Sequence, residues 1–163
     1  MKKFELTNEF ITNMFGTKLF RIRALVEFGD VEAGELGGYV EKESNLGHDD
    51  NAWVYDNAWV YGNARVCGDA LVCGNARVCS DEDYAYAHGF GSVNRTTTFF
   101  RLKDGGVGVR CGCFYGTLAQ FRDKIRETHG ETKKAQEYLM LADLMELRFE
   151  EDENEVGNRK YVE

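Results

Sequence analysis

Hydrophobic positions in the centre of the chain recur with a period of six residues. Alanine and valine each recur five times, at Ala52, Ala58, Ala64, Ala70 and Ala76 and at Val54, Val60, Val66, Val72 and Val78. Asn or Asp precedes each alanine, and Gly, Asp or Ser closes each unit. Alanine and valine stand two apart, so both point to one side of a short strand. The Gly-Asn and Asp-Asn pairs suit the turns because they tolerate left-handed backbone angles. We therefore expect residues 51–80 to form stacked strand-and-turn units with a thin apolar interior.

A hairpin is expected before the repeat. Residues 4–11 and 17–28 read as strands around a turn at 13–16, and apolar and polar side chains alternate along the second strand. This hairpin would cover the open edge of the first unit, since an uncapped edge invites aggregation. We assign it residues 1–33.

A second hairpin and two helices are expected after the repeat. Residues 96–102 and 107–115 flank a Lys-Asp-Gly-Gly turn. Thr117 and Gln120 have the spacing of a capping box, and Gly130 suits the end of that helix. Thr132 opens a helix that runs to about Phe149. This second helix has two apolar stripes, so we expect it to bury on two sides, one of them against another subunit.

The repeat extends less regularly on both sides. Tyr84 continues the valine register, and residues 89–93 would close the last coil. The predicted segments are a hairpin cap (1–33), the repeat coil (34–93), a hairpin with two helices (94–149) and an acidic flexible tail (150–163).

The units Val-Tyr-Asp-Asn-Ala-Trp and Val-Cys-Gly-Asn-Ala-Arg resemble the hexapeptide repeat of left-handed β-helix proteins. The wider arrangement resembles a group of small phage and prophage proteins that carry loose labels such as transferase or polymer-forming protein. This resemblance implies a mainly β protein with C-terminal helices, built on a left-handed parallel β-helix of about three coils. It also implies a phage origin and a homo-oligomer, a trimer or a dimer, but it supplies no activity.

Charge and composition narrow the function classes. The chain of 163 residues carries a net charge of −8, and residues 150–163 hold six acidic and two basic residues. General nucleic-acid binding is disfavoured, because phosphates attract a basic face. No apolar run approaches the roughly 18 residues of a membrane helix, and the first residues lack a signal-peptide core. Five cysteines do not indicate a disulfide framework. We expect a cytoplasmic protein of the bacterial host with no membrane partner.

Aromatic and arginine side chains are the candidate binding residues. The side of the repeat opposite alanine and valine carries Trp53, Tyr55, Trp59, Tyr61, Arg65 and Arg77. Such side chains dominate binding interfaces. The alternative is that the hairpin or the helices cover them. Arg65 and Arg77 could converge with further arginines on a pocket for an anionic ligand at a subunit boundary, and these further arginines are Arg21, Arg23, Arg95, Arg101 and Arg110.

Two functions follow from these residues. The leading hypothesis is a non-enzymatic oligomer that blocks or sequesters a bacterial component, as an anti-CRISPR or anti-signalling inhibitor would. Its target would be a host protein or an anionic nucleotide messenger. The alternative is an acyl-CoA-dependent transferase with His88 as general base. We expect neither cofactor nor metal, because the three histidines lie in unrelated segments and the repeat cysteines would face different directions.

Overall fold

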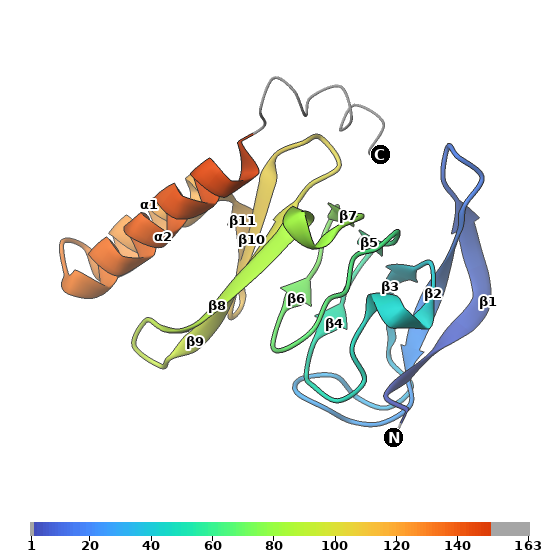
Figure 1. The fold of residues 1–163 in the computed structure, drawn as a ribbon. Coiled ribbons are helices and arrows are strands. Elements are labelled where there is room, and N and C mark those ends of the chain that lie inside the picture. The colour runs from blue at the N-terminus through green and yellow to red at the C-terminus, as the bar shows by residue number, and fades with distance from the viewer. Residues whose placement is uncertain (1, 151–163) are drawn as a thin grey trace.

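A computed structural model describes residues 2–150. The N-terminal hairpin, the repeat and a sheet covered by two helices follow one another across the molecule (Figure 1). None of the helices in this part of the chain is both long and apolar enough to cross a membrane. Except for Glu150, the predicted flexible tail lies outside the described residues.

The predicted N-terminal hairpin is confirmed. Strands β1 (Phe4–Thr12) and β2 (Lys18–Ala24) pair antiparallel, and β2 also pairs antiparallel with β3 (Leu36–Val40). The side chain of Asn13 closes the hairpin turn by accepting hydrogen bonds from the backbone N–H groups of Phe15 and Thr17, each at 3.0 Å. This is the local bond pattern for which asparagine is favoured in turns.

The repeat forms strands of two residues each. They are β4 (Trp53–Val54), β5 (Trp59–Val60), β6 (Leu71–Val72) and β7 (Arg77–Val78), with 3-10 turns at Glu43–Asn45 and Asp81–Asp83 on either side. β4 pairs parallel with β6, and β5 lies parallel between β3 and β7. The inward direction of alanine and valine is confirmed, because all ten of these side chains are at most 2% exposed.

The prediction of a left-handed parallel β-helix of about three coils is wrong. The strands form a mixed sheet in the order β1-β2-β3-β5-β7, an antiparallel sheet in the order β11-β10-β9-β8 and the separate pair β4-β6. Four of the five repeat units supply two strand residues each, and the third supplies only an isolated parallel bridge between Val66 and Leu46, so the parallel ladders of the repeat are short. The longer alternating segments on either side pair as antiparallel hairpins, which need only a tight turn between strands.

The second half of the chain begins with β8, where Tyr84 had been expected to continue the valine register and residues 89–93 to close the last coil. Its four antiparallel strands are β8 (Tyr84–Phe90), β9 (Arg95–Arg101), β10 (Val107–Cys111) and β11 (Phe114–Thr117). The predicted hairpin is confirmed as β9 and β10. Its second strand ends earlier than expected, because Gly112 adopts a φ of +60° and turns the chain back into β11.

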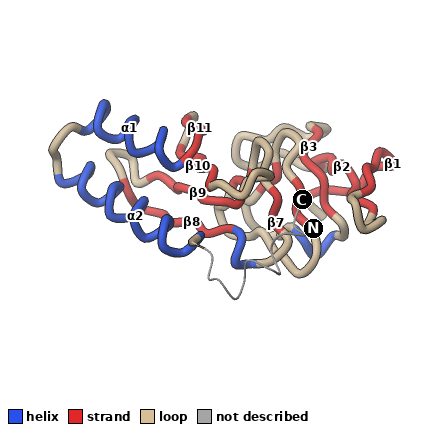
Figure 2. The backbone as a smooth tube through the Cα atoms, turned by 90° about the horizontal axis from the view of Figure 1, so that it is seen from above, coloured by secondary structure: helices blue, strands red, loops and turns tan. Residues whose placement is uncertain are grey.

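The two predicted helices are confirmed. Thr117 caps α1 (Leu118–His129), with the reciprocal bonds of a capping box, and Thr132 caps α2 (Lys133–Phe149). Both helices cover the face of the four-stranded sheet that points away from the repeat (Figure 2).

The molecule therefore has two hydrophobic cores. The repeat core contains the inward alanines and valines with Phe4, Ile22 and Trp53. The helix-side core contains Phe99, Val109 and the buried faces of α1 and α2. The second apolar stripe of α2 is exposed in the single chain, at 71% for Met140, 54% for Leu144 and 67% for Leu147.

Candidate functional site

A groove of about 370 Å³ lies between the repeat and the four-stranded sheet. We call it the seam groove, and its polar lining consists of Asp30, Asn51, Tyr55, Asp69, His88, Arg95, Thr96 and Arg110. Four residues singled out from the sequence meet here: Tyr55, His88, Arg95 and Arg110. They come from three different predictions, namely the aromatic interface, the general base and the anionic pocket.

Strand alternation explains the direction of the groove residues on the sheet. Val109 and Phe99 are paired across β10 and β9 and are both buried under the helices. Their neighbours Arg110 and Thr98, also paired, must then face the repeat. Thr98 confirms this direction, because its hydroxyl accepts a hydrogen bond from the backbone N–H of Leu71 at 3.1 Å.

Arg110 lies against the aromatic ring of the groove. Its guanidinium carbon is 5.0 Å from the centre of the Tyr55 ring, and its Nε donates to the carbonyl oxygen of Gly112 at 2.9 Å. Burial raises the pKa of Tyr55, and the charge of Arg110 opposes that shift. The Tyr55 hydroxyl therefore stays protonated at neutral pH.

Arg95 and Arg110 are half-buried guanidiniums without a carboxylate partner among residues 2–150. Keeping a charge partly buried without a counter-ion is costly, and a bound anion would relieve that cost. Asp30 and Asp69 line the same groove, so the groove offers acceptors as well as cations.

The other arginines predicted for the anionic pocket lie outside the seam groove. Arg21 bonds the carbonyl oxygen of Gly37 and the hydroxyl of Tyr39, each at 2.6 Å, and pairs with Glu9. Arg23 pairs with Glu5 on the hairpin surface. The three arginines Arg65, Arg77 and Arg101 also lie outside the seam groove. Arg101 lies 3.8 Å from Asp83 and donates to the carbonyl oxygen of Phe149 at 3.1 Å. The predicted convergence of all these arginines is therefore not found within one chain.

The predicted aromatic surface divides in two. Trp53 is 0% exposed, with its ring 6.4 Å from that of Phe4 and 5.2 Å from that of Phe28. It cannot reach a partner in this fold, because the N-terminal segments cover it. Trp59 and Tyr61 are half-buried, and the guanidinium of Arg77 lies 3.8 Å over the Trp59 ring.

His88 is exposed at the edge of the groove. Its Nδ1 lies 2.7 Å from the hydroxyl of Thr96, its cross-strand neighbour. This contact leaves Nε2 as the nitrogen that could take up a proton from a bound molecule. Within residues 2–150, no three His, Cys, Asp or Glu side chains are grouped so that they could hold a metal ion.

Sequence reasoning missed Asp30, Asn51, Asp69 and Thr96. Thr96 could have been found by placing residues 84–90 opposite residues 95–101, since that register sets it against His88. Asp30 and Asp69 join the groove only through long-range packing, for which we see no local signal.

The sequence matches no protein-family model and no curated protein.

Proposed function

We propose that this protein is a binding protein whose seam groove holds a small anionic ligand of nucleotide size. The observation that carries the proposal is that one groove is lined by two half-buried guanidiniums, those of Arg95 and Arg110, which have no carboxylate partner among residues 2–150. Arginine recognises phosphate through paired, charge-assisted hydrogen bonds. The volume of about 370 Å³ falls within the range of small-molecule sites, roughly 300–1,000 Å³.

The two carboxylates favour a nucleotide over a bare anion. A phosphate would bind the guanidiniums, while ribose hydroxyls or a base amino group could donate to Asp30 and Asp69. The net charge of −8 disfavours an extended nucleic-acid backbone. The Tyr55 ring, already in contact with Arg110, adds an aromatic surface to the groove.

The resemblance to small phage proteins supports a role in sequestration. In this proposal the protein acts in the cytoplasm of a bacterial host. It withdraws an anionic nucleotide messenger from its receptor and performs no chemistry on it. A homo-oligomer would multiply the number of grooves, and the exposed stripe of α2 is the surface that favours one.

Calorimetric titration with a panel of nucleotides tests this proposal. Arg95→Gln and Arg110→Gln should each weaken binding by roughly 10- to 100-fold, the loss expected for a charge-assisted hydrogen bond. Arg23→Gln is the matched control, because it removes the same charge from a surface ion pair on the hairpin. The proposal fails if the unaltered protein binds none of the nucleotides at millimolar concentration. It also fails if Arg23→Gln weakens binding as much as the groove variants.

The acyl-CoA-dependent transferase stays the second candidate, because His88 lies in the same groove with its Nε2 outside the Thr96 contact. The test is thioester consumption from acetyl-CoA with a panel of amine and hydroxyl acceptors. Turnover that His88→Gln abolishes, with the fold intact by circular dichroism, would replace the binding proposal with this one.

A further inference from the structure

A second hollow of about 210 Å³ lies between the end of the four-stranded sheet and the two helices. We call it the helix-side cavity. Its cationic lining is Arg95 and Lys124, with the imidazole of His129 beside them, and its apolar lining is Phe114, Phe121 and Ile125. None of the described residues that line it is acidic. On a chain with a net charge of −8, this is a local reversal of sign.

Tyr138 anchors the inner wall of this cavity. Its ring meets that of Phe121 edge-on at 5.6 Å and stacks with that of His129 at 5.8 Å. Its hydroxyl lies 3.8 Å from the sulfur of Cys111. Burial, reinforced by Cys111, raises the pKa of Tyr138 to about 12, so the hydroxyl remains a hydrogen-bond donor at neutral pH. The cavity is thus a formed hollow with an apolar wall and a cationic lining.

Arg95 connects the two hollows. Arg95 lines both the seam groove and the helix-side cavity. The chain turns between the two hollows at Gly112. Gly112 lines the seam groove, whereas its neighbours Cys111 and Cys113 line the helix-side cavity. By strand alternation Arg95 shares the side of β9 that carries Phe99, the helix side. Its guanidinium then lies against Gly112, where a Cβ atom would collide with it. One cation therefore serves both hollows.

The small volume of the helix-side cavity indicates that it holds only part of a ligand. Its volume of about 210 Å³ is below the roughly 300 Å³ at which small-molecule sites begin. It is large enough for part of a ligand whose remainder lies elsewhere, and the seam groove is the neighbour that shares Arg95.

We infer that the helix-side cavity is the second half of one extended site and that the ligand is a dinucleotide, bound with a phosphate at Arg95. This inference rests on the proposed function of the seam groove and narrows its ligand class. One nucleoside lies in the seam groove near Tyr55 and Arg110. The other lies against Phe114 and Phe121, with Lys124 beside its phosphate.

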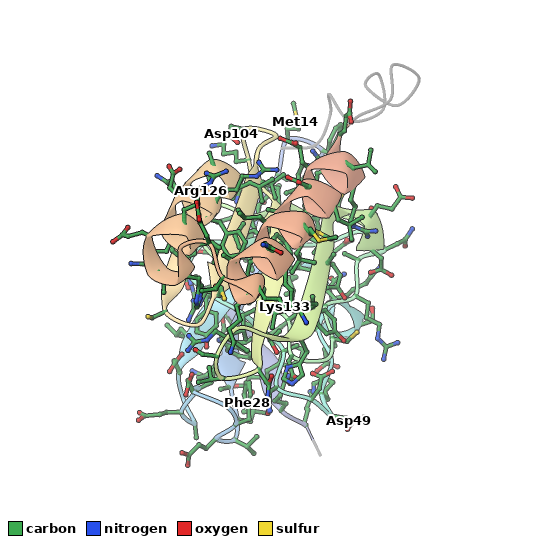
Figure 3. The ribbon with its side chains drawn as sticks, turned by 90° about the vertical axis from the view of Figure 1, so that its left-hand side faces the viewer. Met14, Phe28, Asp49, Asp104, Arg126 and Lys133 are labelled. Atoms are coloured by element: carbon green, nitrogen blue, oxygen red, sulfur yellow. The ribbon has the colours of Figure 1, made fainter. Side chains whose placement is uncertain are left out.

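Figure 3 views the molecule from the helix side and shows Lys133, at the start of α2, below Arg126 of α1.

The test compares AMP with linear and cyclic diadenylate on three variants. Lys124→Gln should weaken binding of a diadenylate by about 5- to 50-fold and leave AMP unchanged, because only the larger ligand reaches the cavity. Arg110→Gln should weaken both ligand types. Arg126→Gln, an exposed cation two residues along α1 that pairs with Asp123, should weaken neither.

Alkylation of Cys113 gives an independent readout. Cys113 is exposed and lines the helix-side cavity, whereas Cys67 is half-buried in the repeat and serves as internal reference. A diadenylate should slow iodoacetamide labelling of Cys113 relative to Cys67, and AMP should not.

The two proposals fail in different ways. One outcome overturns the dinucleotide inference and leaves the proposed function standing. In that outcome AMP binding is weakened by Arg110→Gln, but the linear and the cyclic diadenylate both fail to protect Cys113 and bind the Lys124→Gln variant as well as the unaltered protein. If neither ligand type binds, both are overturned.

Discussion

The two hydrophobic cores of this protein are built in opposite ways. The repeat core stacks small alanine and valine side chains behind strands of two residues, and its parallel pairs join repeat units eighteen residues apart. The helix-side core packs Phe, Tyr and Met side chains between antiparallel strands of four to seven residues and two capped helices.

The contrast between the two cores shows where residues that occur only once in the structure can form a site. A periodic core presents the same inward residues in each unit and so makes a regular scaffold. The irregular sheet supplies residues that occur once, and the candidate site lies where the two kinds of structure meet. Arginines inside either region are held by neighbours, as Arg21 and Arg101 are, whereas Arg95 and Arg110 at the seam have no carboxylate partner among residues 2–150.

The largest expected effect on the free energy of unfolding is a difference between the two tryptophans of the repeat. Trp53→Ala should lower the free energy of unfolding by about 3–5 kcal/mol, because it empties a fully buried site. Trp59→Ala should cost roughly 1–2 kcal/mol, since that ring is only half-buried. Urea unfolding followed by circular dichroism measures both. Equal losses would mean that Trp53 does not belong to the repeat core as described.

Cys73 should make the repeat core sensitive to alkali. Burial raises the pKa of its thiol to about 11, although a hydrogen bond from Arg110 opposes the shift. An unfolded cysteine titrates near ~8.5, so the folded state keeps its proton longer. Stability from this group is complete below pH ~8.5 and is lost as the pH rises toward about 11.

We expect the Cys73 contribution to fall by about 2 kcal/mol between pH 8 and 10.5. Cys73→Ala should show a smaller alkaline loss than the unaltered chain in urea unfolding under reducing conditions. The raised pKa values of Tyr84 and Tyr138 do not involve Cys73, so their effects cancel in the difference. Cys73 is a lesser cause of the raised pKa values of Tyr55 and Tyr115, whose first cause is burial. Identical alkaline losses would show that the Cys73 thiol is not buried as the structure places it.

The smallest effect on stability is expected on the outer face of α2. Leu144→Lys should change the free energy of unfolding by no more than about 0.5 kcal/mol, because Leu144 is 54% exposed. It should nevertheless abolish self-association if the exposed stripe pairs with a second copy of the chain. In an antiparallel pairing, Lys133 and Lys134 at one end of the stripe would face Glu150 at the other.

Sedimentation velocity over a range of concentrations measures that association. Leu36→Lys is the control, because Leu36 is a 55% exposed leucine on β3. A protein that stays monomeric at every concentration, or one that Leu36→Lys dissociates equally well, would exclude the α2 stripe as a subunit interface.

Local signals were enough to predict most elements but not their assembly. The turn at Asn13, the caps at Thr117 and Thr132 and the inward alanines and valines all depend on neighbouring residues, and all are confirmed. The β-helix was wrong because Tyr84 shares the valine register while its segment is long enough to pair antiparallel with β9. In the candidate site, residue type picked out Arg95 and Arg110, but it could not separate them from the five other candidate arginines, which lie outside the seam groove.

The sequence by itself determined the periodic interior, the two hairpins, the two helices and the kinds of side chain available for binding. These depend on backbone preferences and on hydrophobic spacing over fewer than about twenty residues. Only the tertiary structure decided that Trp53 is core, that β8 joins the second sheet and that Arg95 lies between two hollows. Those outcomes depend on which surfaces cover one another across long separations in the chain, and burial and charge pairing are set by that packing.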